Sequence, residues 1–118
     1  MADFMLVLRD NPEQFADVSP EDMQRIVGRY VEWREKLAAT GQMVGGEKLV
    51  DDEGRLLRRG DGALRVLDGP YSETKEIVGG YFILRAESMD EAVSLSESCP
   101  HLDFGPIEIR RIEAGPES

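Results

Sequence analysis

The residues best suited to chemistry lie close together in the segment Asp68–Glu76, which reads Asp-Gly-Pro-Tyr-Ser-Glu-Thr-Lys-Glu. In a functional interpretation, Asp68 or Glu73 acts as a general base, while Tyr71 and Lys75 bind a ligand and stabilise developing negative charge. In a structural interpretation, Asp68 bonds to the backbone of its own turn. Glu73 then either caps the backbone or forms an ion pair with a nearby basic side chain. Turns rich in Asp, Gly and Pro are common, so we favour the structural interpretation and keep the segment as a candidate site.

His101 is the only histidine of the chain, and histidine is the side chain most often used to move protons near neutral pH. It is the third candidate for a catalytic group. A single histidine in a loop is more often solvated, and that is the simpler interpretation. The neighbouring Cys99 and Asp103 do not complete a ligand set, so the sequence predicts no metal site and no cofactor.

Two aromatic residues lie on the first predicted helix, Tyr30 on its apolar stripe and Trp33 at the margin of that stripe. Such residues pack in a core or a dimer interface, or they line a pocket for a flat ligand. Cys99 is interpreted as a small buried hydrophobic residue, because the pattern places no histidine base beside it.

Positive charge is concentrated in one predicted hairpin, which contains Arg55, Arg58, Arg59 and Arg65. These arginines either bind an anionic ligand or an acidic partner surface, or they balance local acids in solvent. The last is the simplest interpretation.

The chain has 118 residues with 14 basic and 24 acidic side chains, a net charge of −10. Its length fits one domain, predicted for residues 1–114 with 115–118 as a tail. The acidic character disfavours binding to nucleic acid or anionic membranes, and no apolar run is long enough to cross a bilayer. The single cysteine and the N-terminal pattern, which differs from a signal peptide, predict a cytoplasmic protein.

Hydrophobic periodicity predicts a strand, a helix, a strand, an inserted hairpin, and then a further strand, helix and strand. Ser19 and Ser88 are the expected helix caps, and the second helix is expected to direct Ala92, Val93, Ser96 and Cys99 inward. A glycine pair at 45–46 predicts a bulge or a close backbone approach. For the same reason a larger side chain at Gly80 should lower the stability of the protein, and Gly80→Val is expected to destabilise it. The predicted strands cover 4–8, 42–50, 55–58, 63–68, 79–86 and 107–113.

Without the hairpin, this is the βαββαβ order of a ferredoxin-like α+β sandwich, in which one antiparallel sheet carries both helices on one face. The other face of such a sheet is bare. Pairing two bare faces would cover them, so the sequence predicts a homodimer.

The segment Asp68–Glu76, followed by Gly79-Gly80-Tyr81, resembles the DGPF-type branch of the YCII-related domain family, with Tyr71 in place of phenylalanine. The resemblance extends over nearly the whole chain, including Cys99-Pro100, and implies a dimeric α+β barrel. Members of this branch are often encoded beside extracytoplasmic-function sigma factors. Some members of the wider family are similar to enzymes with a His–Asp pair, whose histidine lies in the first helix and whose aspartate precedes a Pro-aromatic pair. Here the first helix has no histidine and Cys99 precedes Pro100.

Two functions follow as hypotheses. The first is a small-molecule-binding or regulatory module, linked to a sigma factor as the resemblance implies. The alternative is a cofactor-free enzyme of the lyase or isomerase type, acting on a small polar or aromatic substrate. It would use Asp68–Glu76 and His101 in a cleft between the sheet and the hairpin. The missing His–Asp pair favours the first hypothesis, and a deep cavity with converging carboxylates would favour the second.

Overall fold

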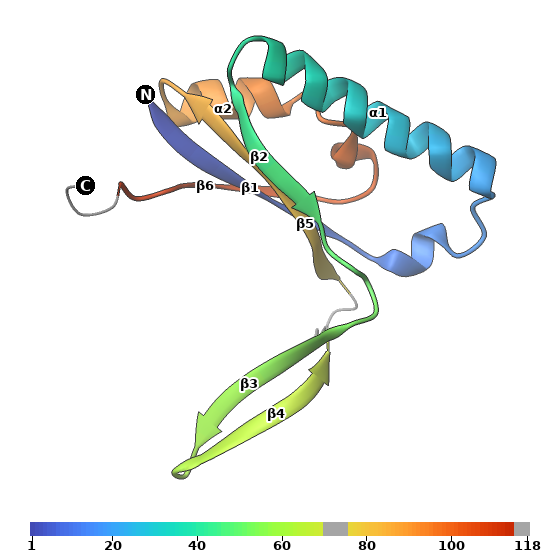
Figure 1. The fold of residues 1–118 in the computed structure, drawn as a ribbon, viewed down its shortest axis with the longest axis vertical. Coiled ribbons are helices and arrows are strands. Elements are labelled where there is room, and N and C mark those ends of the chain that lie inside the picture. The colour runs from blue at the N-terminus through green and yellow to red at the C-terminus, as the bar shows by residue number, and fades with distance from the viewer. Residues whose placement is uncertain (70–75, 115–118) are drawn as a thin grey trace.

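The computed structural model describes residues 1–69 and 76–114 (Figure 1). The elements follow the predicted order, with two short 3₁₀ helices added. They are β1 (Ala2–Asp10), η1 (Pro12–Phe15), α1 (Pro20–Ala39), β2 (Met43–Lys48), β3 (Gly54–Gly60), β4 (Ala63–Gly69), β5 (Ile77–Ala86), α2 (Met89–Ser96), η2 (Pro100–Asp103) and β6 (Ile107–Arg111).

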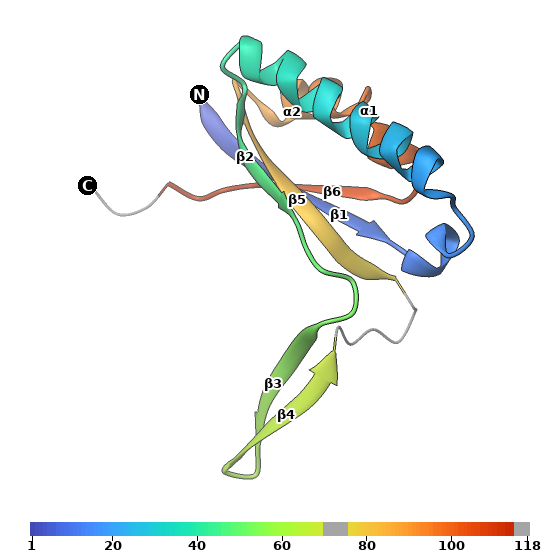
Figure 2. The same ribbon diagram turned by 45° about the vertical axis from the view of Figure 1, so that its right-hand side comes forward.

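Four of the strands form one antiparallel sheet in the order β2-β5-β1-β6. Burial alternates along β1, where Phe4, Leu6, Leu8 and Asp10 are buried and the residues between them are half-buried. The alternation shows that one face of the sheet packs against the core. Both helices lie on that face, and no described element covers the other (Figure 2). The predicted ferredoxin-like α+β sandwich is therefore confirmed.

The helix termini are built as the sequence predicts. Ser19 Oγ accepts from Asp22 N at 3.1 Å, and Ser88 Oγ accepts from Glu91 N at 3.1 Å. Each bond satisfies a backbone N–H that the first turn of a helix leaves free. The carboxylate of Glu91 accepts from the backbone of Glu87 at 2.8 Å, one residue before the donor that a capping box uses.

One residue of the second helix was predicted on the wrong face. Val93 is 43% exposed, whereas Ala92 and Ser96 are buried on α2 and Cys99 is buried beyond its end. Because Ala92 and Ser96 are four positions apart, they share a face, and Val93 lies about 100° away from Ala92 around the helix.

The core is centred on Trp33, which is the buried residue of α1 rather than a marginal one. Its ring meets the ring of Phe82 edge-on at 5.1 Å, and its Nε1–H donates to Ser98 Oγ at 3.0 Å. Cys99 belongs to the same cluster, and burial raises the pKa of its thiol to about 11. The thiol therefore stays protonated and acts as a small apolar group.

The inserted hairpin, β3 and β4, forms a separate two-stranded sheet that extends beyond the ends of β2 and β5 (Figures 1 and 2). Within the four-stranded sheet, the pairing of β2 is irregular, because its register against β5 shifts between Met43 and Gly45. A Cβ at Gly46 would lie 2.6 Å from the carbonyl oxygen of Tyr81. Both alternatives predicted for the glycine pair, a bulge and a close approach, are thus present.

Candidate functional site

A cavity of about 350 Å³ lies between α1 and the covered face of the sheet. This volume is within the usual range of small-molecule sites. Polar groups enter it from β1, α1, the end of β2 and η2, which brings together segments far apart in the sequence. Its apolar walls include Leu8, Phe15, Met23, Ile26, Val27 and Val31.

His101 lines this cavity and is only 2% exposed. Its Nε2 lies 2.8 Å from the carbonyl oxygen of Arg9, and its Nδ1 lies 2.9 Å from the hydroxyl of Tyr30. A carbonyl oxygen can only accept, so in the neutral ring Nε2–H donates to Arg9, and Nδ1 accepts from the Tyr30 hydroxyl. The expectation that His101 is solvated was therefore wrong, because η2 turns its ring inward between β1 and α1.

Tyr30 is held by aromatic neighbours as well as by this hydrogen bond. Its ring stacks on Phe104 at a centroid distance of 6.3 Å and meets the ring of His101 edge-on at 6.1 Å. Burial raises the pKa of its phenol, so the hydroxyl keeps its proton at neutral pH. Because that proton is donated to His101, the phenolic oxygen is left with acceptor capacity toward the cavity.

Asp10 is the carboxylate that sequence reasoning missed. It is the last residue of β1, lines the cavity and is 8% exposed. Burial raises its pKa, and the positive charge of Lys48 opposes that rise. A pattern in the sequence could have identified it, because Asp10 continues the alternation of Phe4, Leu6 and Leu8 on the covered face.

Two basic side chains complete the polar end. Lys48 Nζ donates to Leu49 O at 2.6 Å and to Asp51 Oδ1 at 2.7 Å. An ammonium group has three N–H donors, and bonds to the described residues use two of them, so the third could donate to a ligand. Arg34 donates to the carbonyl of Gly46 at 3.0 Å, which ties α1 to the bulged strand beside the cavity.

The sequence profile of the YCII-related domain family matches residues 2–114. The chain belongs to this family. A comparison with curated proteins gives no significant match. Among solved structures, the fold is similar to that of 5-chloro-2-hydroxyhydroquinone dehydrochlorinase from Burkholderia phenoliruptrix AC1100, determined in complex with 2,5-dihydroxybenzoquinone. The two sequences are 22% identical, the alignment covers 96% of this chain and 95% of that chain, and the TM-score is 0.53.

The structure brings together only some of the predicted site residues of this YCII-related domain. Tyr30 and His101 line the cavity, whereas Trp33 is in the core behind it. Tyr71, Glu73 and Lys75 lie outside the described residues. The cavity lies between the sheet and α1, and the cleft predicted between the sheet and the hairpin stays a prediction.

Asp68 and Gly69 are described by the structure, whereas the next six residues of the segment are not. Asp68 lies within β4 rather than in a turn, opposite Arg55 of β3. Its side chain is 93% exposed, and its Oδ1 is 3.3 Å from Arg55 Nε. Within the described residues Asp68 is thus one member of an exposed cross-strand ion pair, and the predicted bond to the turn that follows would involve residues outside the described ones.

From this placement we expect Asp68→Ala to change the free energy of unfolding by less than about 0.5 kcal/mol, because exposed ion pairs contribute little. Urea unfolding of the wild type and the variant would measure this. A loss of about 1 kcal/mol or more would contradict the expectation and restore the turn interpretation.

Within residues 1–69 and 76–114, no group of three or more His, Cys, Asp or Glu side chains is arranged to hold a metal ion. In the same part of the chain, no helix has the length and apolar character that crossing a membrane requires.

Proposed function

We propose that this YCII-related domain binds a small, largely apolar molecule in the cavity under α1, with a hydrogen-bond-donating group directed at Asp10 and Tyr30. The observation that carries the proposal is the burial of Asp10 and of the Tyr30–His101 pair in one apolar cavity. A buried carboxylate is costly unless it is paired. A ligand that donates a hydrogen bond to this carboxylate would offset that cost.

The chemistry of the polar end limits the ligand class. An ionised Asp10 and the oxygen of Tyr30 both accept hydrogen bonds, so the ligand should carry a hydroxyl or amino group. The third N–H of Lys48 can donate to a carbonyl oxygen. A small ring with hydroxyl and carbonyl substituents fits these requirements and the apolar walls.

A suitable probe is 2,5-dihydroxybenzoquinone, because a relative in fold was determined in complex with it. We expect the wild type to bind this probe and Tyr30→Phe to bind it about tenfold more weakly, since the variant loses an acceptor and leaves His101 Nδ1 without its donor. Isothermal titration calorimetry would measure both affinities.

The matched control is Ser94→Ala, which removes an exposed hydroxyl from α2 outside the cavity. It should bind the probe as the wild type does. Equal affinities for Tyr30→Phe and the wild type would show that Tyr30 does not contact the ligand. If the wild type does not bind the probe, the proposed class of ligand is wrong.

A second candidate function is a cofactor-free lyase or isomerase, and the raised pKa of Asp10 favours it. Asp10 would take a proton from a carbon next to a ligand carbonyl and become a neutral carboxylic acid. The electron pair of the broken C–H bond would form a carbon–carbon double bond, and the π pair of the carbonyl would move to its oxygen, where Lys48 stabilises the negative charge. His101 has both ring nitrogens engaged, so it would act only through Tyr30.

Two further parts of the proposal concern the assembly of the protein and the cellular process in which it acts. The uncovered sheet face carries Met5, Val7, Tyr81 and Ile83, which are half-buried and lie opposite one another in register. Pairing of two such faces would give a homodimer and the dimeric α+β barrel expected from the DGPF-type resemblance. The protein would act in the cytoplasm, in a response that is linked to a sigma factor. Binding of the ligand in the cavity would be the signal to which that response reacts.

A further inference from the structure

The β3–β4 hairpin has a well-defined geometry that its own sequence encodes. Seven residue pairs join its strands in unbroken register, from Gly54–Gly69 to Gly60–Ala63. The turn is Asp61-Gly62, with φ of 51° and 75°. Two successive positive φ values are those of a type I′ turn, whose twist matches that of the strands. The hairpin is therefore a regularly paired two-stranded arm rather than a loop.

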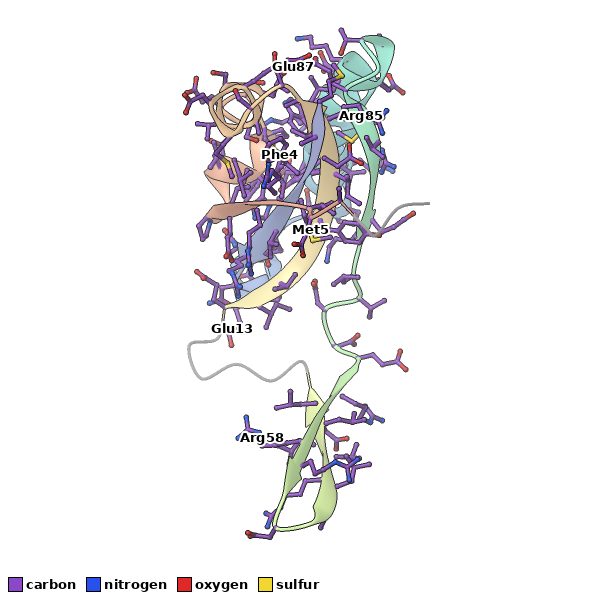
Figure 3. All side chains as sticks on the ribbon, turned by 90° about the vertical axis from the view of Figure 1, so that its left-hand side faces the viewer. Phe4, Met5, Glu13, Arg58, Arg85 and Glu87 are labelled. Carbon is purple, nitrogen blue, oxygen red and sulfur yellow. The ribbon has the colours of Figure 1, made fainter. Side chains whose placement is uncertain are left out.

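The arm exposes apolar side chains on both of its faces. Leu57, Leu64 and Val66 share one face and each exposes more than half of its surface, while Leu56 and Leu67 form a cross-strand pair on the other. Figure 3 shows the arm, with Arg58 labelled, apart from the body of the molecule. A hairpin of two strands is only marginally stable in water unless its apolar side chains pack against another surface.

The charge of the arm is opposite to that of the body. Residues 54–69 contain four arginines and two aspartates, a net charge of +2. The rest of the chain contains ten basic and 22 acidic residues, a net charge of −12. Opposite charges favour docking of the arm on a surface such as the body of this same protein.

We propose that the β3–β4 arm packs on the acidic body of a second copy of this chain, and that the second copy does the same in return. The inference rests on the proposed homodimer and adds an interface to it. The arm extends beyond the ends of β2 and β5 (Figure 2). Two copies paired by a two-fold axis would therefore each direct an arm alongside the other. Apolar side chains would give affinity, and the arginines would give orientation.

The test is the dimer dissociation constant of the full chain, measured by sedimentation equilibrium. We expect a dimer for the wild type at micromolar concentration. Two double variants, Leu57→Ser with Val66→Ser and Arg58→Glu with Arg65→Glu, should each weaken the dimer about tenfold or more. Salt should weaken the wild-type dimer as well, because it screens the arginines. The control is Val93→Ser, an exposed apolar residue of α2, which should leave the constant within about twofold.

Hydrogen exchange gives a second measurement that needs no variant. Backbone amides of β3 and β4 should exchange slowly where the dimer predominates and rapidly where the protein is diluted to the monomer. A wild type that stays monomeric would overturn both the homodimer and the arm contact. A stable dimer whose affinity is unchanged by both arm variants, or whose arm amides exchange equally fast in both states, would overturn the arm contact alone.

Discussion

Gly105→Ala is expected to destabilise the protein by about 3 kcal/mol or more, because overpacking against fixed backbone is among the most costly single changes. A Cβ at this position would lie 1.9 Å from the carbonyl oxygen of Arg9 and 3.0 Å from its carbonyl carbon. Neither atom belongs to a flexible side chain. The segment after η2 and the end of β1 would have to move apart.

The same change should also disturb the site. The Arg9 carbonyl accepts from Nε2 of His101, and Gly105 N donates to the backbone oxygen of His101 at 3.0 Å. Displacement of Arg9 would therefore release the ring that bonds to Tyr30. Urea unfolding would measure the loss of stability, and a titration with 2,5-dihydroxybenzoquinone would measure the effect on the site.

Gly28→Ala provides the control for this experiment. Gly28 lies in the interior of α1, and a Cβ there would meet no atom within 4 Å. Alanine should stabilise the helix by about 0.5–1 kcal/mol, since glycine loses more backbone entropy on folding. If Gly105→Ala were as stable as Gly28→Ala, the close approach of Gly105 to Arg9 would be wrong.

Asp10→Asn should have opposite effects on stability and on function. At pH 7 we expect the variant to be more stable than the wild type, with a larger free energy of unfolding, because the amide avoids the cost of burying a charge. At the same pH, the affinity for 2,5-dihydroxybenzoquinone should fall about tenfold, since an amide accepts more weakly than a carboxylate. If the domain is an enzyme, turnover should fall about 100-fold or more.

The pH dependence gives the sign of the stability effect. The folded-state pKa of Asp10 is raised above 3.8, so the folded protein binds this proton more tightly than the unfolded chain does. The contribution of this protonation to the free energy of unfolding is complete below the unfolded-state pKa. That contribution is lost as the pH rises through the folded-state pKa. The stability advantage of Asp10→Asn should therefore shrink as the pH falls toward about 4.

Urea unfolding at neutral and acidic pH would measure this difference, with Asp52→Asn as the control at an exposed carboxylate. A wild type that is more stable than Asp10→Asn at pH 7 would show that the ionised carboxylate is paired. Unchanged probe binding in Asp10→Asn would remove Asp10 from the site.

Gly80 shows how a sequence-based prediction gains its reason from the structure. The glycine pair in a predicted strand already indicated a close backbone approach. In the structure, a Cβ at Gly80 would lie 2.8 Å from the carbonyl oxygen of Glu47 on the neighbouring strand. By contrast, nothing in the local sequence around Gly105 indicated an approach to Arg9, because the two residues are brought together by the packing of η2 on β1.

The sequence by itself determined the local structure of this YCII-related domain. The continuous apolar run at residues 4–8 identified β1, Ser19 and Ser88 identified the helix starts, and the Gly60–Gly62 turn identified the hairpin. These features depend on backbone dihedral angles and on hydrogen bonds between near neighbours, which short patterns encode. The element order then restricted the topology to a ferredoxin-like sandwich.

Only the tertiary structure decided which of the polar residues form the site. His101 bonds to Tyr30 and to Arg9, which are 71 and 92 positions away. Asp10 joins them because β1 ends under α1, whereas Asp68 lies on an exposed arm. Burial of a polar side chain depends on how whole elements pack, and the free energy of that packing comes from apolar area shared among many residues. No short pattern around Tyr30 or His101 contains that information, and the period of two along β1 indicates the face on which Asp10 lies but not the residues it meets there.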